Sequence, residues 1–410
     1  MQLPDQFVAP EYNGRSIANV PATVAATAGV SIDALPPLQP HLWQPVAQNV
    51  NRVVVIILDA FGWNLLQAYR NDLAPVLDQA TILEQITSIF PSTTSAALSS
   101  LWTGFPSTGH GLMGLHQFLP EYAAGTQMIA FTPVFAQLPN ALIDAGLDLN
   151  DFLLVPGIAE QLAARGIKTY SFKGREISDS ALSYMHGRGV AGNYGAFTFA
   201  DMLVQMSELL HAKAGEPLYV CGYWPTIDTL SHFRNWTGTA VKAELISLFQ
   251  QINTTFLQQL TTEAKAGTAF FIVADHGQTA MDRDQLLHLE DHPQLMRDLL
   301  MRPMGDPRVA YLYTRQGRQT AVLDYFASHL TDLAIALPVD EALATGWFGP
   351  MPISPVVRDR MGDVVVIMRD QAILYTNDDQ FLVDHFYAGH GGLTRDEMQV
   401  PWIGFHLPSL

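Results

Sequence analysis

The most constraining segment of the sequence is an uninterrupted apolar run, RVVVIIL at 52–58, which stops at Asp59. Apolar residues at successive positions are typical of a strand that is buried on both faces inside a parallel sheet. Similar runs recur along the chain, at 153–155, 218–221, 269–273 and 364–368. Helix-like stretches lie between them, at 158–165, 199–213 and 240–264. This alternation predicts an α/β fold with a doubly wound, mostly parallel central sheet flanked by helices.

The organisation of the chain changes after Gly277, where helical patterns mix with Pro- and Gly-rich tracts. We expect residues 281–385 to form a smaller α+β part inserted into the main domain. The main domain would then comprise residues 51–280 and 386–410. Residues 1–50 are rich in Pro, Ala and Gln and have weak periodicity, so we expect them to wrap the body as loops and short turns.

Composition excludes several classes of protein. Charged residues make up 15% of the 410 residues and hydrophobic residues 48%, which is typical of a folded chain. The net charge of −17 argues against a nucleic-acid partner. No apolar run approaches the length of about 18 residues expected of a membrane span, so we expect no membrane partner. The sequence lacks a secretory leader pattern and has a single cysteine, Cys221, which together favour a cytoplasmic location.

Six potential metal ligands lie at or after the ends of the expected strands or in a glycine-rich loop. Taken singly, each has an ordinary explanation, such as a helix cap, a turn residue or a surface pair at i, i+4 spacing. Their combination is more informative, because ligands bind at the carboxyl ends of strands in open α/β sheets. Imidazole and carboxylate together suit zinc or another divalent cation. The residues are Asp59, Asp228, His232, Asp275, His276 and His390.

A cluster of four hydroxyl residues, 92–95, precedes a helical Ala/Leu run. One or two of them are explained as helix N-caps. The alternative is a nucleophile at a helix N-terminus, where free N–H groups and the helix dipole favour an incoming phosphate. A threonine hydroxyl needs activation for this role, and a metal ion can supply it.

With these residues in this order, the chain resembles the alkaline phosphatase superfamily over about residues 50 to 405. Within it, the chain is most similar to the type I phosphodiesterase/nucleotide pyrophosphatase group. The resemblance implies an alkaline phosphatase-like fold and a hydrolase that cleaves phosphodiester or pyrophosphate bonds. It also implies two divalent metal ions, most simply Zn²⁺, a covalent phosphothreonine intermediate and a small phosphorylated substrate such as a nucleotide.

The resemblance assigns roles to particular residues. Counting ten residues back from Gly104, as in the family, identifies Thr94 as the nucleophile, with Thr93 as the alternative. One metal ion would be held by Asp59, Asp275 and His276 together with the Thr94 oxygen. The other would be held by Asp228, His232 and His390.

The chain departs from the family pattern where substrate binds. The family's phosphate-binding Asn is replaced by Leu115, which leaves His116 and Gln117 as candidates for that role. Tyr223 matches one of the two aromatic residues that stack on a base, whereas Ser95 stands at the other position. These differences leave open a phosphonate hydrolase or phosphomonoesterase on the same scaffold, or a non-catalytic metal-binding relative.

Two further segments have mainly structural interpretations. Lys173 begins a KGRE segment after an expected strand, which could line a pocket but is more typical of a solvated turn. His288 and His292 are spaced i, i+4 in an acidic stretch, which favours a surface pair over a metal site.

Overall fold

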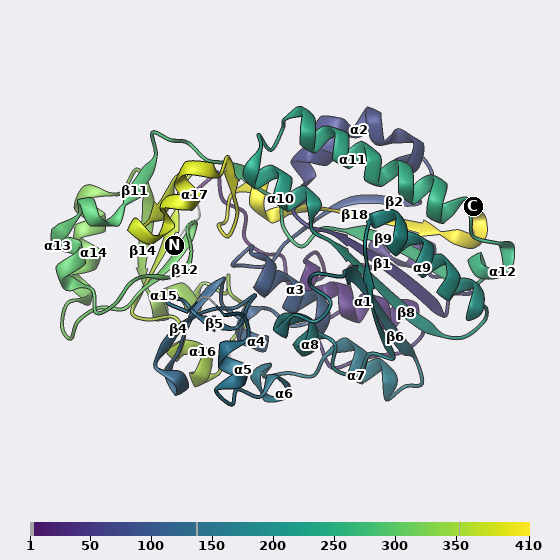
Figure 1. The fold of residues 1–410 in the computed structure, drawn as a ribbon, viewed down its shortest axis with the longest axis horizontal. Coiled ribbons are helices and arrows are strands. Elements are labelled where there is room, and N and C mark those ends of the chain that lie inside the picture. Colours follow the sequence, from purple (N-terminus) through teal and green to yellow (C-terminus); the bar gives the residue numbers. More distant parts are fainter. Residues whose placement is uncertain (1–3, 137, 352) are drawn as a thin grey trace.

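A computed structural model describes residues 4–136, 138–351 and 353–410. Its central sheet has seven strands, and β1 runs parallel to both of its neighbours, β8 and β9. Only β18 pairs antiparallel to its neighbours, so the sheet is mixed and mostly parallel, as predicted (Figure 1). The strand order is β2 (Ile82–Thr87), β18 (Gln399–His406), β9 (Thr268–Val273), β1 (Arg52–Leu58), β8 (Leu218–Trp224), β6 (Lys168–Gly174) and β7 (Gly192–Ala196).

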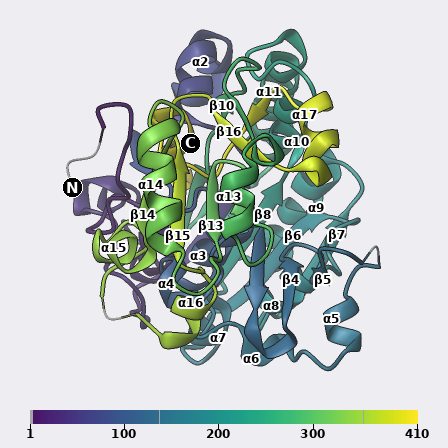
Figure 2. The ribbon, with the colours of Figure 1, turned by 90° about the vertical axis from the view of Figure 1, so that its left-hand side faces the viewer.

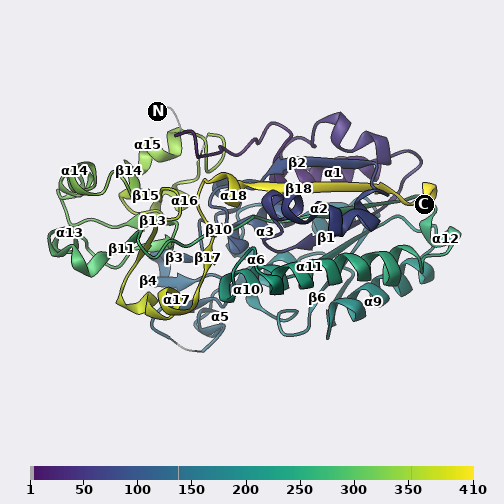
Figure 3. The ribbon, with the colours of Figure 1, turned by 90° about the horizontal axis from the view of Figure 1, so that it is seen from above.

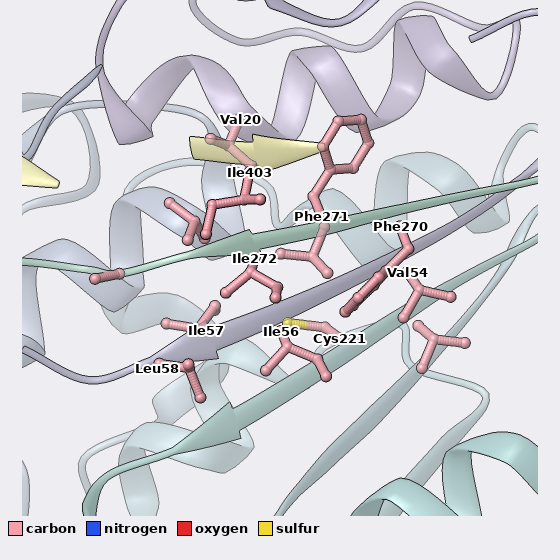
Figure 4. Packing of buried hydrophobic residues seen from close by; sticks show 14 of the residues in the cluster. Val20, Val54, Ile56, Ile57, Leu58, Cys221, Phe270, Phe271, Ile272 and Ile403 are labelled. Carbon is pink, nitrogen blue, oxygen red and sulfur yellow. The ribbon is translucent and has the colours of Figure 1, made fainter. Parts of the chain in front are cut away.

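The central strands β1 and β9 are buried along their whole length, which explains why they are apolar at successive positions. All seven residues of β1 are buried. In β9, Phe270 stacks on Phe405, whereas its neighbour Phe271 stacks on Trp402. Successive side chains of a strand point to opposite faces, so the two phenylalanines pack into different layers of the core (Figure 4).

Helices cover both faces of this sheet (Figure 1). One layer contains α2 (Trp63–Leu77), α9 (Phe199–Ala212) and α11 (Thr239–Gln251). The other contains α1 (Val20–Thr27), α3 (Thr94–Thr103) and α7 (Ile158–Ala163). Within the described chain, none of the helices has the length and apolar character that crossing a bilayer requires.

The N-terminal segment lies against the central sheet, where Trp402 Nε1 donates a hydrogen bond of 2.7 Å to Leu42 O. It contains α1 and short 3₁₀ turns, so it is more helical than the expected loops. Residues 1–3 lie outside the described part of the chain.

A second seven-stranded sheet, antiparallel throughout, forms the other lobe of the molecule (Figures 2 and 3). Three of its strands come from residues 116–133, upstream of the segment expected to be inserted, so that segment's boundaries stay a prediction. The strand order is β14 (Ala334–Pro338), β15 (Val364–Met368), β13 (Val309–Leu312), β12 (Met304–Asp306), β3 (His116–Leu119), β4 (Ala124–Gln127) and β5 (Thr132–Pro133).

Three sequence expectations are corrected. The run at 364–368 is a buried strand, β15, but it belongs to the antiparallel sheet, because helices and loops cover both faces there too. The run at 153–155 is not a strand: it follows the short helix α6 (Leu149–Phe152), and Pro156 next to it lacks the N–H that a ladder needs. The expected helix at 240–264 is broken after α11 by a π-helical turn, Ile252–Leu257.

A buried ion pair ties the second lobe to the C-terminal part of the central domain. Arg308 Nε and Nη2 donate to the two carboxylate oxygens of Glu397 at 3.0 and 2.9 Å. The same carboxylate accepts hydrogen bonds from the backbone N–H groups of Gly392 and Thr394. Glu397 therefore holds the loop that follows His390.

We expect Glu397→Ala to lower the free energy of unfolding by about 3–5 kcal/mol, because it leaves a buried guanidinium without its counter-charge. The side chains of Arg308 and Glu397 are only 1% and 0% exposed. Glu84→Ala is the matched control, since Glu84 pairs with Arg15 at the surface, where the side chains are 46% and 28% exposed. That variant should lose less than about 1 kcal/mol. Urea denaturation measures both, and equal losses would contradict the prediction.

Candidate metal centre and active site

The six predicted ligand residues meet at one edge of the central sheet. Asp59 follows β1, and Asp275 and His276 follow β9. Asp228 and His232 lie on α10 (Thr226–Phe233), the helix after β8. Because β1 pairs in parallel with β8 and β9, the carboxyl ends of the three strands lie side by side.

His390 reaches the same place from the far end of the chain. It follows β17 (Ala388–Gly389), which pairs with β10 (Thr279–Ala280), the strand just downstream of His276. The rings of His276 and His390 stack with their centroids 3.9 Å apart. The β10–β17 pairing therefore places a C-terminal histidine against the central sheet's site.

The first part of the cluster surrounds His276. Its Nε2 atom lies 3.4 Å from Asp59 Oδ1 and 3.5 Å from Asp275 Oδ2. The second part surrounds Asp228, whose Oδ1 atom lies 3.2 Å from His232 Nε2 and 3.6 Å from His390 Nε2. Both parts have the carboxylate and imidazole donors that divalent cations take.

Asp228 connects the two parts. Potential ligand atoms lie within 4.8 Å of one another in two groups, Asp228–His232–His390 and Asp59–Asp228–His276. Asp228 belongs to both groups, whereas the sequence placed it in only one. Its carboxylate also accepts a hydrogen bond from the Gln278 amide, a neighbour that sequence reasoning missed.

The three histidines share one arrangement. Each Nδ1 donates to a backbone carbonyl: His276 to Gly277 at 3.0 Å, His232 to Ala388 at 2.8 Å and His390 to Ser92 at 3.2 Å. A neutral imidazole then carries its lone pair on Nε2, the atom that faces the carboxylates. Such a backbone contact fixes the tautomer and ring orientation of a metal-ligating histidine.

The negative charge of the buried carboxylates is not balanced within the cluster. Asp59 Oδ1 and Asp275 Oδ2 are buried without a hydrogen-bond partner among the residues that the structure describes. Burial and the charges of Asp275 and Asp228 raise the pKa of Asp59 well above its usual value. Burial also opposes ionisation of Asp228, but the neighbouring His232 and His390 lower its pKa. A buried anion without a partner is costly, so these residues fit a divalent cation.

The two threonines of the hydroxyl cluster have different hydrogen-bond partners. Thr94, the first residue of α3, has its Oγ1 atom 3.1 Å from His276 Nε2. The buried Thr93 hydroxyl instead donates to Asp306 Oδ1 at 2.9 Å. Thr94 is therefore the hydroxyl that faces the cluster, at a helix N-terminus where N–H groups favour an anion.

The three substrate-binding candidates lie in different surroundings. The Tyr223 hydroxyl donates to Asp59 Oδ2, so this side chain contacts the ligand cluster. Gln117 is fully buried, and its amide bonds to Met113 N at 2.8 Å and Gly111 O at 3.3 Å, within its own loop. His116 lines a cavity of about 240 Å³ in the second lobe.

Lys173 corrects the expectation of a solvated turn. Strand β6 continues through Gly174, so the lysine is buried and lines a cavity of about 80 Å³ beside Thr94 and Tyr223. Its Nζ atom donates to Ser183 Oγ at 3.1 Å. Burial lowers the pKa of Lys173 to about 8. In the sequence, the apolar residues stop at Phe172, so the hydrophobic pattern does not predict that the strand continues through Lys173.

The family model described as type I phosphodiesterase/nucleotide pyrophosphatase matches residues 53–392. No curated protein sequence matches the chain.

Two solved proteins show the same fold. Murine ectonucleotide pyrophosphatase/phosphodiesterase 5 is 16% identical with a TM-score of 0.60, covering 86% of this chain and 87% of its own. An inactive form of it in complex with AMP is 14% identical with a TM-score of 0.61 and the same coverage. Phosphonoacetate hydrolase from Sinorhizobium meliloti 1021, in complex with phosphonoformate, is 16% identical with a TM-score of 0.63, covering 86% of this chain and 89% of its own.

Proposed function

This chain belongs to the type I phosphodiesterase/nucleotide pyrophosphatase family, and we propose that it acts through a covalent phosphothreonine at Thr94. As a family member it is a phosphoric ester hydrolase that acts on small phosphorylated substrates. The finer proposal is cleavage of phosphodiester or pyrophosphate bonds. The proposal of Thr94 as the nucleophile rests on one observation above all: the Thr94 hydroxyl lies 3.1 Å from His276 Nε2, inside the ligand cluster.

We propose two zinc ions as the cofactors. Asp59, Asp275 and His276 would hold one ion with the Thr94 oxygen, and Asp228, His232 and His390 would hold the other. The orphaned buried oxygens of Asp59 and Asp275 support a cation there. A divalent cation supplies Lewis acidity, which offsets charge on phosphoryl oxygens and lowers the pKa of a nearby hydroxyl group.

Residues of the chain supply the nucleophile, the phosphate-binding groups and the orientation of the ligands. In the proposed first step, the Thr94 hydroxyl loses its proton to water and Oγ1 forms a bond to phosphorus, while the bond from phosphorus to the leaving oxygen breaks and that oxygen takes a proton from water. Water then hydrolyses the phosphothreonine, which returns the hydroxyl and releases the phosphorylated product. The N-terminus of α3 favours the phosphate next to Thr94. The backbone carbonyls at Nδ1 keep the histidine rings oriented throughout.

We expect protein stripped of metal and reloaded with Zn²⁺ to hydrolyse bis-p-nitrophenyl phosphate in preference to p-nitrophenyl phosphate. The three carboxylates of the cluster offset most of the positive charge of two zinc ions, so little of that charge is left to bind the additional negative charge of the monoester. Release of p-nitrophenol gives kcat/KM for both substrates, with metal-stripped protein as the control. A preference for the monoester would contradict the diester proposal.

Hydrolysis of a phosphonate or a monoester is a second candidate, favoured by Lys173. Its ammonium group lies in the cavity that Thr94 lines, where it would meet an additional anionic group on the substrate. The structural neighbour solved with phosphonoformate is compatible with this candidate. Phosphonoacetate added to the same assay, with release of inorganic phosphate as the readout, distinguishes it. The cytoplasmic location expected from the sequence stays a prediction.

A further inference from the structure

A separate cavity of about 90 Å³ adjoins the ligand cluster on the side of His232 and His390. It shares no lining residue with the cavity beside Thr94. It does share Leu115, Asp306, Pro307 and Leu382 with the larger cavity of the second lobe. The two cavities therefore adjoin each other, one beside the cluster and the other along the second sheet.

The walls of this cavity are apolar. Leu115, Met281, Ile373, Leu382 and Phe386 are among the residues that line it. Leu115 stands where the family has its phosphate-binding Asn, so the departure from the family pattern lies in this wall.

The polar side chains that line the cavity form hydrogen bonds with other groups of the protein. Asp306 accepts hydrogen bonds from the Thr93 hydroxyl and from Leu115 N. The Arg308 guanidinium donates to Glu397. The Nδ1 atom of His232 donates to Ala388 O. An occupant therefore meets carbon surface, except at the histidine Nε2 atoms.

Aromatic rings surround one side of the cavity. The Phe386 ring lies 4.5 Å from the His232 ring, and the Phe233 ring lies 4.9 Å from that of Phe386. Phe233 and Phe381 are 41% and 60% exposed. Exposed aromatic side chains grouped beside an apolar cavity are typical of a site that takes an apolar partner.

The proposed reaction indicates what this partner is. Attacking and leaving oxygens lie roughly in line across phosphorus in phosphoryl transfer. Thr94 contacts His276 at one end of the cluster, and His232 lies at the other end of the chain of contacts. A leaving oxygen opposite Thr94 would therefore lie on the His232 and His390 side, at the mouth of this cavity.

We propose that the cavity binds the leaving group, and that the preferred leaving group is an apolar, ring-containing alcohol. This inference rests on the proposed function. As the Thr94 hydroxyl loses its proton to water and Oγ1 bonds to phosphorus, the bond between phosphorus and the alcohol oxygen breaks. That oxygen keeps the electron pair and takes a proton from water, so the product is the free alcohol in the cavity.

Direct binding of 4-methylumbelliferone, an apolar bicyclic alcohol, tests the proposal by fluorescence anisotropy on the full chain without added metal. We expect saturable binding that weakens about tenfold in Phe386→Ala, because the substitution removes both the aromatic contact and the apolar area of the ring. Leu115→Ala, which removes a different wall, should also weaken binding. Phe197→Ala, an exposed phenylalanine outside the three cavities described above, is the matched control.

Several results would overturn the proposal. They are an absence of saturable binding, unchanged affinity in both Phe386→Ala and Leu115→Ala, or affinity lost in Ile129→Ala alone, because Ile129 lines the cavity beside Thr94. A second measurement, diester hydrolysis, distinguishes a failure of the cavity proposal from a failure of the proposed function. Hydrolysis of bis-p-nitrophenyl phosphate by zinc-loaded protein would leave the function standing when the cavity fails. Phe386-dependent binding without hydrolysis of any diester would overturn the function and the leaving-group role together.

Discussion

Thr94→Ala is expected to abolish hydrolysis of bis-p-nitrophenyl phosphate, with a loss in kcat on the order of a thousandfold or more. The substitution removes the only oxygen of this side chain, so no covalent phosphothreonine can form. Bound zinc should remain, because six carboxylate and imidazole donors are untouched. Steady-state kinetics together with metal analysis by mass spectrometry measure both quantities.

Neighbouring substitutions provide the controls. Thr94→Ser keeps a hydroxyl at the helix start and should retain measurable turnover. Thr93→Ala should keep turnover within about tenfold, because the Thr93 hydroxyl donates its hydrogen bond to Asp306, whereas the Thr94 hydroxyl contacts His276. Near-normal activity in Thr94→Ala would remove Thr94 as the nucleophile, and loss of turnover in Thr93→Ala alone would transfer that role to Thr93.

The sequence predicted the central sheet because that sheet leaves a local signal. A strand buried on both faces must be apolar at nearly every position, as 52–58 is, and a functional residue at its end breaks the run abruptly, as Asp59 does. Because neighbouring strands of a parallel sheet run in the same direction, their carboxyl ends lie side by side, and the sequence needs no other signal to predict this. Three of the ligand-bearing segments, those after β1, β8 and β9, follow this rule.

The second lobe is harder to predict because its pairings are non-local. Strand β12 pairs with β3 through Gly305 and His116, which are far apart in the sequence, and no local pattern encodes such a contact. The β15 run is as apolar as β1, so hydrophobicity alone cannot assign it to one sheet or the other. Periodicity reports how deeply a strand is buried, whereas its partners depend on the packing of the whole chain.

The same limit applies inside the site. The sequence identifies ligand types, but the distances between side chains decide how ligands are shared. Asp228 lies one helical turn from His232, and the family resemblance assigned these two residues to one ion together with His390. In the folded chain its carboxylate also lies within 4.8 Å of potential ligand atoms of Asp59 and His276. Gln278 carries no metal-ligand signal, and its contact with Asp228 appears only in three dimensions.

Asp228→Ala is therefore expected to remove both zinc ions, whereas His232→Ala should remove only one. Asp228 belongs to both groups of potential ligand atoms, and His232 belongs to one. Losing a shared carboxylate also removes the negative charge that lies between the two sets of histidines. Hydrolysis of bis-p-nitrophenyl phosphate should fall on the order of a thousandfold or more, because two-metal catalysis needs both ions.

Metal content measured by mass spectrometry on dialysed protein decides between two arrangements. His288→Ala is the matched control, because His288 contacts Glu290 and Asp291 outside the cluster and should leave both ions bound. Loss of one ion in Asp228→Ala, equal to that in His232→Ala, would contradict sharing and favour two separate sites of three side chains each. Loss of both ions would make Asp228 the residue that couples occupancy of the two sites, so the ions would be lost together as a chelator is added.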